Sequence, residues 1–342
     1  MKLHLRILSL LLWGSCLSLI SCRHEALADV EPVFTKRAFV EATYENEWQY
    51  AVGEGTDWAH YPEWEEVFQM SYEMLKPRLP EGLRAQLSLE NGAASVFNMH
   101  PDGGEIPFAE TQQSLLFYNN NTEFIVFDGL HSVKEAVATT RSRSELARPG
   151  ILEGTDGDAM NAPDMLYSYY IESFNGEEHL DEEVIAIRLK PLVFSYLIQY
   201  EFQKGLEDIV QAKGALVGMA DAVSMSDGRT STKTATLLFK GVVRNFAVQA
   251  LVHSFGIPDY PREEEEPGNR KYALELDVKL RSGNVQHFRF DVSDQVSRQP
   301  RGGVVRITGI EVDEKLAHPS YDSGFDVNVS GWGEDEHILL PI

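Results

Sequence analysis

The sequence predicts an all-β protein built from two antiparallel β-sandwiches in tandem, with one short helix. Two observations carry this prediction. Apolar and polar residues alternate over many short runs, as in strands with one buried face, and turn-forming residues separate the runs. Only residues 61–75 follow the 3.6-residue period of a helix. Because such strands need a second sheet to cover their apolar face, sandwiches are the expected architecture.

The first half of the chain contains several short strand patterns. Alternation predicts a strand over residues 83–89, which ends at the turn Asn91-Gly92. The run SLLFYNNNTEFIVFDG, residues 114–129, predicts two strands joined by an asparagine-rich turn. Residues 133–139 predict one more short strand.

The second half contains the clearest hairpin pattern of the chain. Residues 272–280 and 288–292 alternate on either side of the turn Ser282-Gly283-Asn284. Further strands are expected over residues 246–252, 304–312 and 325–329.

In the run that starts near residue 184, the large apolar residues change from odd to even positions. Ile185, Ile187 and Leu189 share one parity, whereas the large apolar residues from Leu192 to Phe202 have the other. If both runs face the same core, one extra residue must be accommodated. We therefore expect a β-bulge near Lys190-Pro191, because Pro191 has no backbone N–H to donate to a neighbouring strand.

Composition divides the chain into five segments. Residues 1–21 have the features of a lipoprotein signal peptide, and residues 22–33 those of a polar tether. An N-terminal β-sandwich domain is expected over 34–142 and a C-terminal one over 184–342. The stretch between them, 143–183, begins with a run rich in Gly, Pro and Asp that has no lasting period, so it is the predicted inter-domain linker.

The signal peptide ends on a cysteine. Lys2 and Arg6 form a positive start, and residues 7–20 are apolar but too short to span a bilayer comfortably. The string LISC, residues 19–22, resembles the bacterial lipoprotein box, in which the cysteine receives the lipid. Cys22 is therefore the predicted lipidation site; the alternative is an ordinary signal peptide with an accidental cysteine.

Lipidation would decide how the exported protein is held. Several acyl chains on Cys22 would anchor it to a membrane without a spanning segment. Cys16, the other cysteine, would leave with the leader, so no intramolecular disulfide is expected.

The charge and the motifs exclude several functions. A formal net charge of -23 repels phosphate backbones, and no basic stripe with interleaved aromatic residues is visible, so nucleic acid is not an expected partner. The sequence has no nucleophile elbow, P-loop, dinucleotide fingerprint or zinc-protease motif. We therefore predict no catalytic residues and no cofactor.

Two groups of residues are candidate ligand sites, each with a simpler explanation. Asp156, Asp158, Asn161 and Asp164 offer oxygen ligands suited to calcium, but their spacing departs from an EF-hand and suits an ordinary linker. The aromatic residues Trp48, Trp58, Tyr61 and Trp64 could form a platform for sugars. Packing in a core or between domains is the favoured interpretation of the aromatic group.

Several stretches together resemble a known family. They are YNNNTEFIVFDGL, AVATTRSR, PDMLYSYYIESF, LKPLVFSYLIQYEFQKGLEDIVQAKGALVGMADAV, FDVSDQVSRQPRGGVV and FDVNVSGWGEDEHILLPI. In order and spacing they resemble Bacteroidales surface lipoproteins of unknown function, allied to fimbrillin-like and fimbrial anchor (Mfa-like) proteins. The resemblance implies tandem transthyretin-like (Greek-key) sandwiches at the outer membrane. It transfers only one functional residue, the lipidated Cys22.

The resemblance also implies a way of acting. In the allied fimbrial proteins, a strand of one subunit inserts beside a strand of the next, so main-chain hydrogen bonds give affinity. We therefore expect a non-enzymatic lipoprotein at the cell surface, a fimbrial anchor, accessory or adhesin component that binds a protein partner along a strand edge. The alternatives are a glycan-binding surface lipoprotein and, less favoured, an enzyme whose carboxylates are brought together only by the fold.

Overall fold

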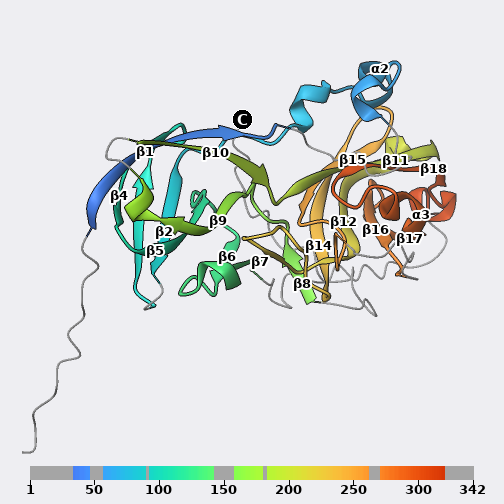
Figure 1. The fold of residues 1–342 in the computed structure, drawn as a ribbon. Coiled ribbons are helices and arrows are strands. Elements are labelled where there is room, and N and C mark those ends of the chain that lie inside the picture. The colour runs from blue at the N-terminus through green and yellow to red at the C-terminus, as the bar shows by residue number, and fades with distance from the viewer. Residues whose placement is uncertain are drawn as a thin grey trace, which may run out of the picture.

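The computed structural model of the chain describes residues 34–46, 57–89, 92–141, 158–179, 183–261 and 270–319. Within these ranges nearly all regular structure is β, arranged in two large sheets and one small sheet (Figure 1). The all-β prediction is therefore confirmed, while the transthyretin-like connectivity stays a prediction.

The first large sheet has seven strands in the order β3-β2-β5-β9-β10-β1-β4. Neighbours are antiparallel except β1 and β10, which run parallel. The alternating residues of its strands surround a core that includes Val40, Phe108 and Phe117, each fully buried. The strands are β1 (Phe34–Tyr44), β2 (Leu83–Leu89), β3 (Ala94–Met99), β4 (Gly103–Ala109), β5 (Gln112–Tyr118), β9 (Tyr167–Asn175) and β10 (Glu183–Pro191).

The second large sheet has eight strands, seven of them in the order β17-β16-β12-β14-β15-β11-β18, with β8 paired to β14. Tyr196, Ile198 and Tyr200 of β11 lie in its core with buried residues of six other strands. The strands are β8 (Asp158–Asn161), β11 (Phe194–Lys204), β12 (Ile209–Ala220), β14 (Thr234–Val243), β15 (Val248–Ser254), β16 (Ala273–Leu280), β17 (Val285–Asp291) and β18 (Gly303–Glu311).

A small third sheet joins the two halves of the chain. Its strands β6 (Ile125–Asp128), β7 (Val137–Thr140) and β13 (Ala222–Ser224) stand in the order β13-β7-β6. Their apolar residues share a core with Tyr118 of β5 and with Ala220 at the end of β12. This third core therefore connects the first sheet to the second.

The change of phase near residue 190 has a different cause from the predicted bulge. Ile185, Ile187 and Leu189 face the core of the first sheet, whereas Tyr196 and Ile198 face that of the second. Strand β10 ends at Pro191 and β11 begins at Phe194, so the chain crosses between sheets there. The prediction of one continuous core face was wrong, because two cores, each with its own parity, meet at this point.

The predicted helix is interrupted, and the prediction of a single helix was wrong. Residues 61–75 contain the five-residue helix α2 (Trp64–Phe68), and 3₁₀ turns lie before and after it, η1 (Trp58–His60) and η2 (Tyr72–Leu75). Gln69 ends α2 because its φ of 49° is left-handed. The described residues contain two more short helices, α3 (Ser293–Ser297) and α4 (Glu314–Ala317), and the 3₁₀ turns η3 (Val133–Glu135), η5 (Gly176–Glu178) and η6 (Leu206–Asp208).

Sheet membership crosses the predicted segment boundaries. Strand β9 falls within the predicted linker 143–183 but pairs with β5 of the first sheet. Strand β10 falls within the predicted C-terminal domain but pairs with β1. The division into 34–142 and 184–342 therefore stays a prediction about folding units, and the strand predicted over 325–329 lies outside the described residues.

Candidate interaction surfaces

Residues 57–76, here called the capping segment, carry an aromatic cluster onto the second sheet. The chain leaves β1 in the first sheet, places α2 beside β15 and β11, and returns to the first sheet at β2 (Figure 1). The rings of Trp64 and Phe68 are 4.4 Å apart, and those of Trp58 and Tyr61 are 5.2 Å apart. With Leu75 they bury Leu197 of β11 and Val304 of β18, so the cluster covers the face of the sheet opposite its core.

The burial of the described aromatic candidates bears on their two interpretations. Trp58 is 8% exposed and Trp64 is 7% exposed, and Trp58 donates a hydrogen bond through Nε1 to Oε1 of Gln299, at 2.8 Å. Tyr61 is half-buried against the same rings, and Trp48 lies outside the described residues. Because a sugar stacks on an exposed ring face, the described rings suit core packing and not a platform.

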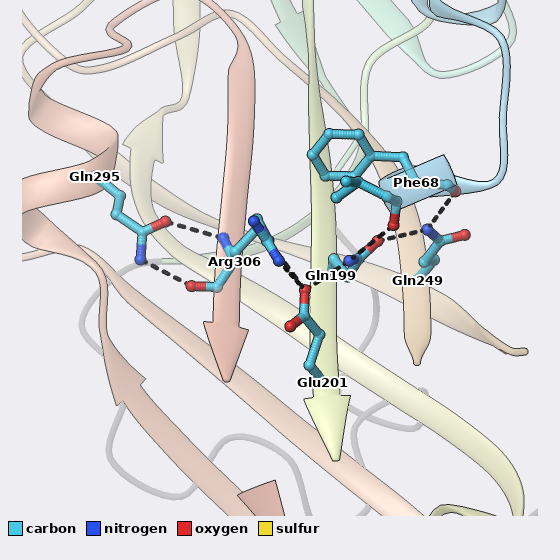
Figure 2. Close-up of polar contacts among 7 residues, drawn as sticks. Phe68, Gln199, Glu201, Gln249, Gln295 and Arg306 are labelled. Atoms are coloured by element: carbon cyan, nitrogen blue, oxygen red, sulfur yellow. Dashed lines mark hydrogen bonds and ion pairs between the residues drawn. The ribbon is translucent and has the colours of Figure 1, made fainter. Parts of the chain in front are cut away.

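A polar network ties the capping segment to the second sheet (Figure 2). Gln249 of β15 donates through Nε2 to the backbone oxygen of Phe68, at 2.9 Å, and to Oε1 of Gln199, at 2.7 Å. Gln199 in turn donates to Oε1 of Glu201, at 2.7 Å. Buried amides of this kind hold a segment in one position because an unmade hydrogen bond there is costly.

The network continues from β11 to β18 and helix α3. The guanidinium of Arg306 donates through Nη2 and Nε to Oε1 of Glu201, at 2.6 and 2.9 Å, and its Cζ lies 5.8 Å from the centre of the Phe68 ring. Gln295 of α3 contacts the backbone of Arg306 (Figure 2). No pattern in the sequence predicted this network, because its members are isolated polar residues on three strands and a short helix.

The calcium candidates have structural contacts in the described part of the chain. Oδ2 of Asp164 accepts hydrogen bonds from the backbone N–H groups of Glu123 and Phe124, at 2.7 and 2.6 Å. Asn161 lies in β8, and its backbone oxygen accepts from Oγ1 of Thr140 at 2.8 Å. Asp156 lies outside the described residues, and only the backbone of Asp158 is described. The described residues contain no group of three or more His, Cys, Asp or Glu able to hold a metal ion.

Two carboxylates that the hairpin pattern placed on the outward face are buried. Glu275 and Asp277 of β16 are 2% and 5% exposed, although their parity is opposite to that of the core residues Leu274 and Leu276. On the neighbouring strand β17, Arg289 pairs with Glu275, and Nδ1 of His287 lies 2.6 Å from Oδ1 of Asp277. Burial raises the pKa of both carboxyls above their usual values, and the basic partners oppose that shift only in part.

Substituting glutamine for Glu275 is expected to make stability depend less on pH. A raised pKa in the folded state means that the wild type loses stability as pH rises from the usual carboxyl pKa through the raised one. Glu275→Gln should therefore gain stability relative to the wild type as the pH rises above the usual glutamate pKa of 4.5. Urea unfolding at several pH values measures the difference. Glu105→Gln, which removes an exposed carboxylate paired with Arg37, is the control and should show no such trend; equal pH profiles for Glu275→Gln and the wild type would contradict the expectation.

None of the helices in the described ranges is long and apolar enough to cross a membrane.

The outermost strands of the two large sheets are β3 and β4 in the first and β17 and β18 in the second. An edge strand carries backbone groups that can accept a further strand, so β3, β4 and β17 are the candidate sites for a partner that docks as a strand; on β18, side-chain amides already bond to the backbone of Val304 and Arg306.

Comparison with known proteins shows first a fold that the chain shares and then the family to which it belongs. A crystal structure of a candidate adhesin from Bacteroides ovatus shares the fold, with a TM-score of 0.57 and 19% identity over 85% of this chain and 96% of that one. A family model described as a domain of unknown function, DUF5119, matches residues 69–240, about half of the chain. The chain belongs to this family, as the resemblance of its sequence stretches predicted.

Two further proteins are similar to this chain. A Bacteroides ovatus protein named as a candidate fimbrium anchoring subunit, Fim4B, is 27% identical over 307 residues, which cover 80% of this chain and 89% of that protein. A crystal structure from Bacteroides thetaiotaomicron, described as a candidate polysaccharide-binding protein, has a TM-score of 0.46 and 12% identity over 80% of this chain and 90% of that one. The second similarity is too low to support an argument about function.

Proposed function

We propose that this chain is a non-enzymatic component of a bacterial surface fimbrial or adhesive system, an anchor, accessory or adhesin subunit. The observation that carries the proposal is the 27% identity to the candidate fimbrium anchoring subunit, because it extends over 89% of that protein. The fold supports it, since extended sheets with free edges suit binding through the backbone.

The proposed partner is a fimbrial subunit or another surface protein that adds an extended segment to a sheet edge. Main-chain hydrogen bonds supply affinity in this mode, and side chains at alternate positions supply register. Glycan binding is the alternative, and the burial of Trp58 and Trp64 gives it no support. An enzyme that uses Glu275 and Asp277 is not proposed, since Arg289 and His287 pair with them.

The proposed location is the outer membrane, with the protein exported and lipid-anchored through Cys22, exposed at the cell surface. The leader and the LISC string support this location. One acyl chain binds a membrane only marginally, whereas the several chains of a lipoprotein hold it stably, at about 0.8 kcal/mol per buried methylene.

Cys22→Ala is expected to release the protein from the membrane. The wild type should incorporate labelled palmitate, sediment with outer membranes and co-purify with identified all-β fimbrial subunits after mild cross-linking. The variant should lose the label and the membrane association because it has no lipidated thiol. Cys16→Ala, which changes a leader residue, is the matched control and should behave as wild type. An unlabelled wild type would refute the anchor, whereas a labelled wild type that recovers no such subunit would refute the fimbrial role.

A further inference from the structure

The segment FDVSDQVSRQPRGGVV, part of the family resemblance, forms α3 and the start of β18. Among the described strands, β18 is outermost in its sheet and pairs only with β11. Gln295 donates through Nε2 to the backbone oxygen of Arg306, at 3.0 Å, and accepts through Oε1 from the N–H of Arg306, at 2.9 Å. Gln299 makes the same pair of bonds to Val304, both at 2.8 Å. Two side-chain amides thus occupy four backbone groups on the outer side of β18.

The spacing of the two glutamines matches that of a strand. Gln295 lies in α3, and Gln299 lies in the turn after it, where its N–H donates to the backbone oxygen of Val296 at 3.0 Å. Four residues of helical turn advance about 6 Å along the axis. Positions two apart on a strand, such as Val304 and Arg306, are separated by about 6.6 Å. A carboxamide also offers one donor and one acceptor, the same two groups that a residue of an added strand would present. Gln295 and Gln299 therefore act as two residues of a strand running antiparallel to β18.

Other residues fix the two amides in place. Val292 and Val296, on either side of Gln295, are buried in the core of the second sheet. Gln299 also donates to the backbone oxygen of Gln295, at 3.1 Å, and accepts from Nε1 of Trp58 in the capping segment, at 2.8 Å. At Gly303 a Cβ atom would lie 1.9 Å from Oε1 of Gln299, so glycine is needed where the amide approaches the strand. These contacts hold both amides in fixed positions beside β18.

We propose that Gln295 and Gln299 form a surrogate strand that closes the β18 edge against pairing with a second copy of this chain. An open edge strand is a template for another strand, and the β18 edges of two copies can meet about a two-fold axis. A second copy is the partner considered, because copies that the proposed lipid on Cys22 holds on one membrane surface would meet each other at high local concentration. This closure is a property of the chain itself and does not depend on the proposed fimbrial role.

The double variant Gln295→Ala/Gln299→Ala tests the proposal. It removes the four amide bonds, so the backbone groups of Val304 and Arg306 become available to another copy. In sedimentation equilibrium of the chain without its leader and cysteine, the double variant should self-associate at least about tenfold more tightly than the wild type. Hydrogen exchange at Val304 and Arg306 should be faster than in the wild type at low concentration and should slow as the protein associates.

Two further variants supply a substitute for the alanine variant and a control. Gln295→Met/Gln299→Met keeps the side-chain length without adding charge but removes the amide donors and acceptors, so it should also associate more tightly, and it serves if the alanine variant does not fold. Gln112→Ala, which alters an exposed glutamine bonded to Ser173 in the first sheet, should sediment as wild type. Faster exchange at Val304 and Arg306 without tighter association would overturn the proposed role, and unchanged exchange there would overturn the closure itself.

Discussion

Phe68→Ala is expected to destabilise the protein by about 3–5 kcal/mol and to release the capping segment from the second sheet. The Phe68 side chain is fully buried, and its ring centre lies 4.4 Å from that of Trp64 and 5.8 Å from that of Tyr61. Removing the ring leaves a cavity among side chains that belong to a short helix and two 3₁₀ turns. Such short helical pieces have little stability of their own and depend on packing.

Two measurements distinguish local release from global loss of stability. Urea unfolding gives the total change, and native-state hydrogen exchange shows whether residues 57–76 open before the strands beneath them. Met74→Ala is the control, since Met74 lies in the same segment and is 65% exposed, so it should cost little. If Phe68→Ala costs no more than Met74→Ala, the cluster does not hold the segment, and the polar network around Gln199 and Gln249 must do so.

The local pattern of the sequence predicted the strands well because each strand has one face against a core. The hairpin of β16 and β17 is the clearest case, since Leu274, Leu276 and Val278 alternate inward as predicted. The same rule failed for the opposite face of β16, where Glu275 and Asp277 are buried although their parity suggested solvent. Parity says which residues share a face, but whether that face is covered depends on tertiary packing.

Local sequence patterns could not predict which distant strands pair with each other. The parity change at Lys190-Pro191 was visible, yet a bulge and a crossing between sheets produce the same pattern in sequence. The pairing of β13 with β7 joins residues more than eighty positions apart, and no local period records it. Gln295 of α3 and Gln299 just after it were visible in the family stretch, but their four-residue spacing acquires meaning only beside the edge of β18.

Gly103→Ala is expected to be the most damaging single-methyl change in the first sheet, with a cost above about 4 kcal/mol or a failure to fold. Gly103 begins β4 directly after the turn from β3, where its N–H donates to the backbone oxygen of His100 at 2.9 Å. A Cβ atom there would lie 1.8 Å from the backbone oxygen of Val40, in the middle of β1. Because β1 also pairs with β10, the clash cannot be relieved without moving a strand between two neighbours.

A second glycine separates the clash from the backbone strain. Gly103 has a φ of 114°, which alanine tolerates poorly, but Gly283 in the β16–β17 turn has a comparable φ of 93° and no atom within 4 Å of a Cβ. Gly283→Ala should therefore cost only the strain of a positive φ, about 1–2 kcal/mol. Thermal and urea unfolding of both variants measure the difference. Equal costs would mean that strain alone requires glycine at both sites; a much larger cost at Gly103 would mean that the close approach of β4 to β1 requires it.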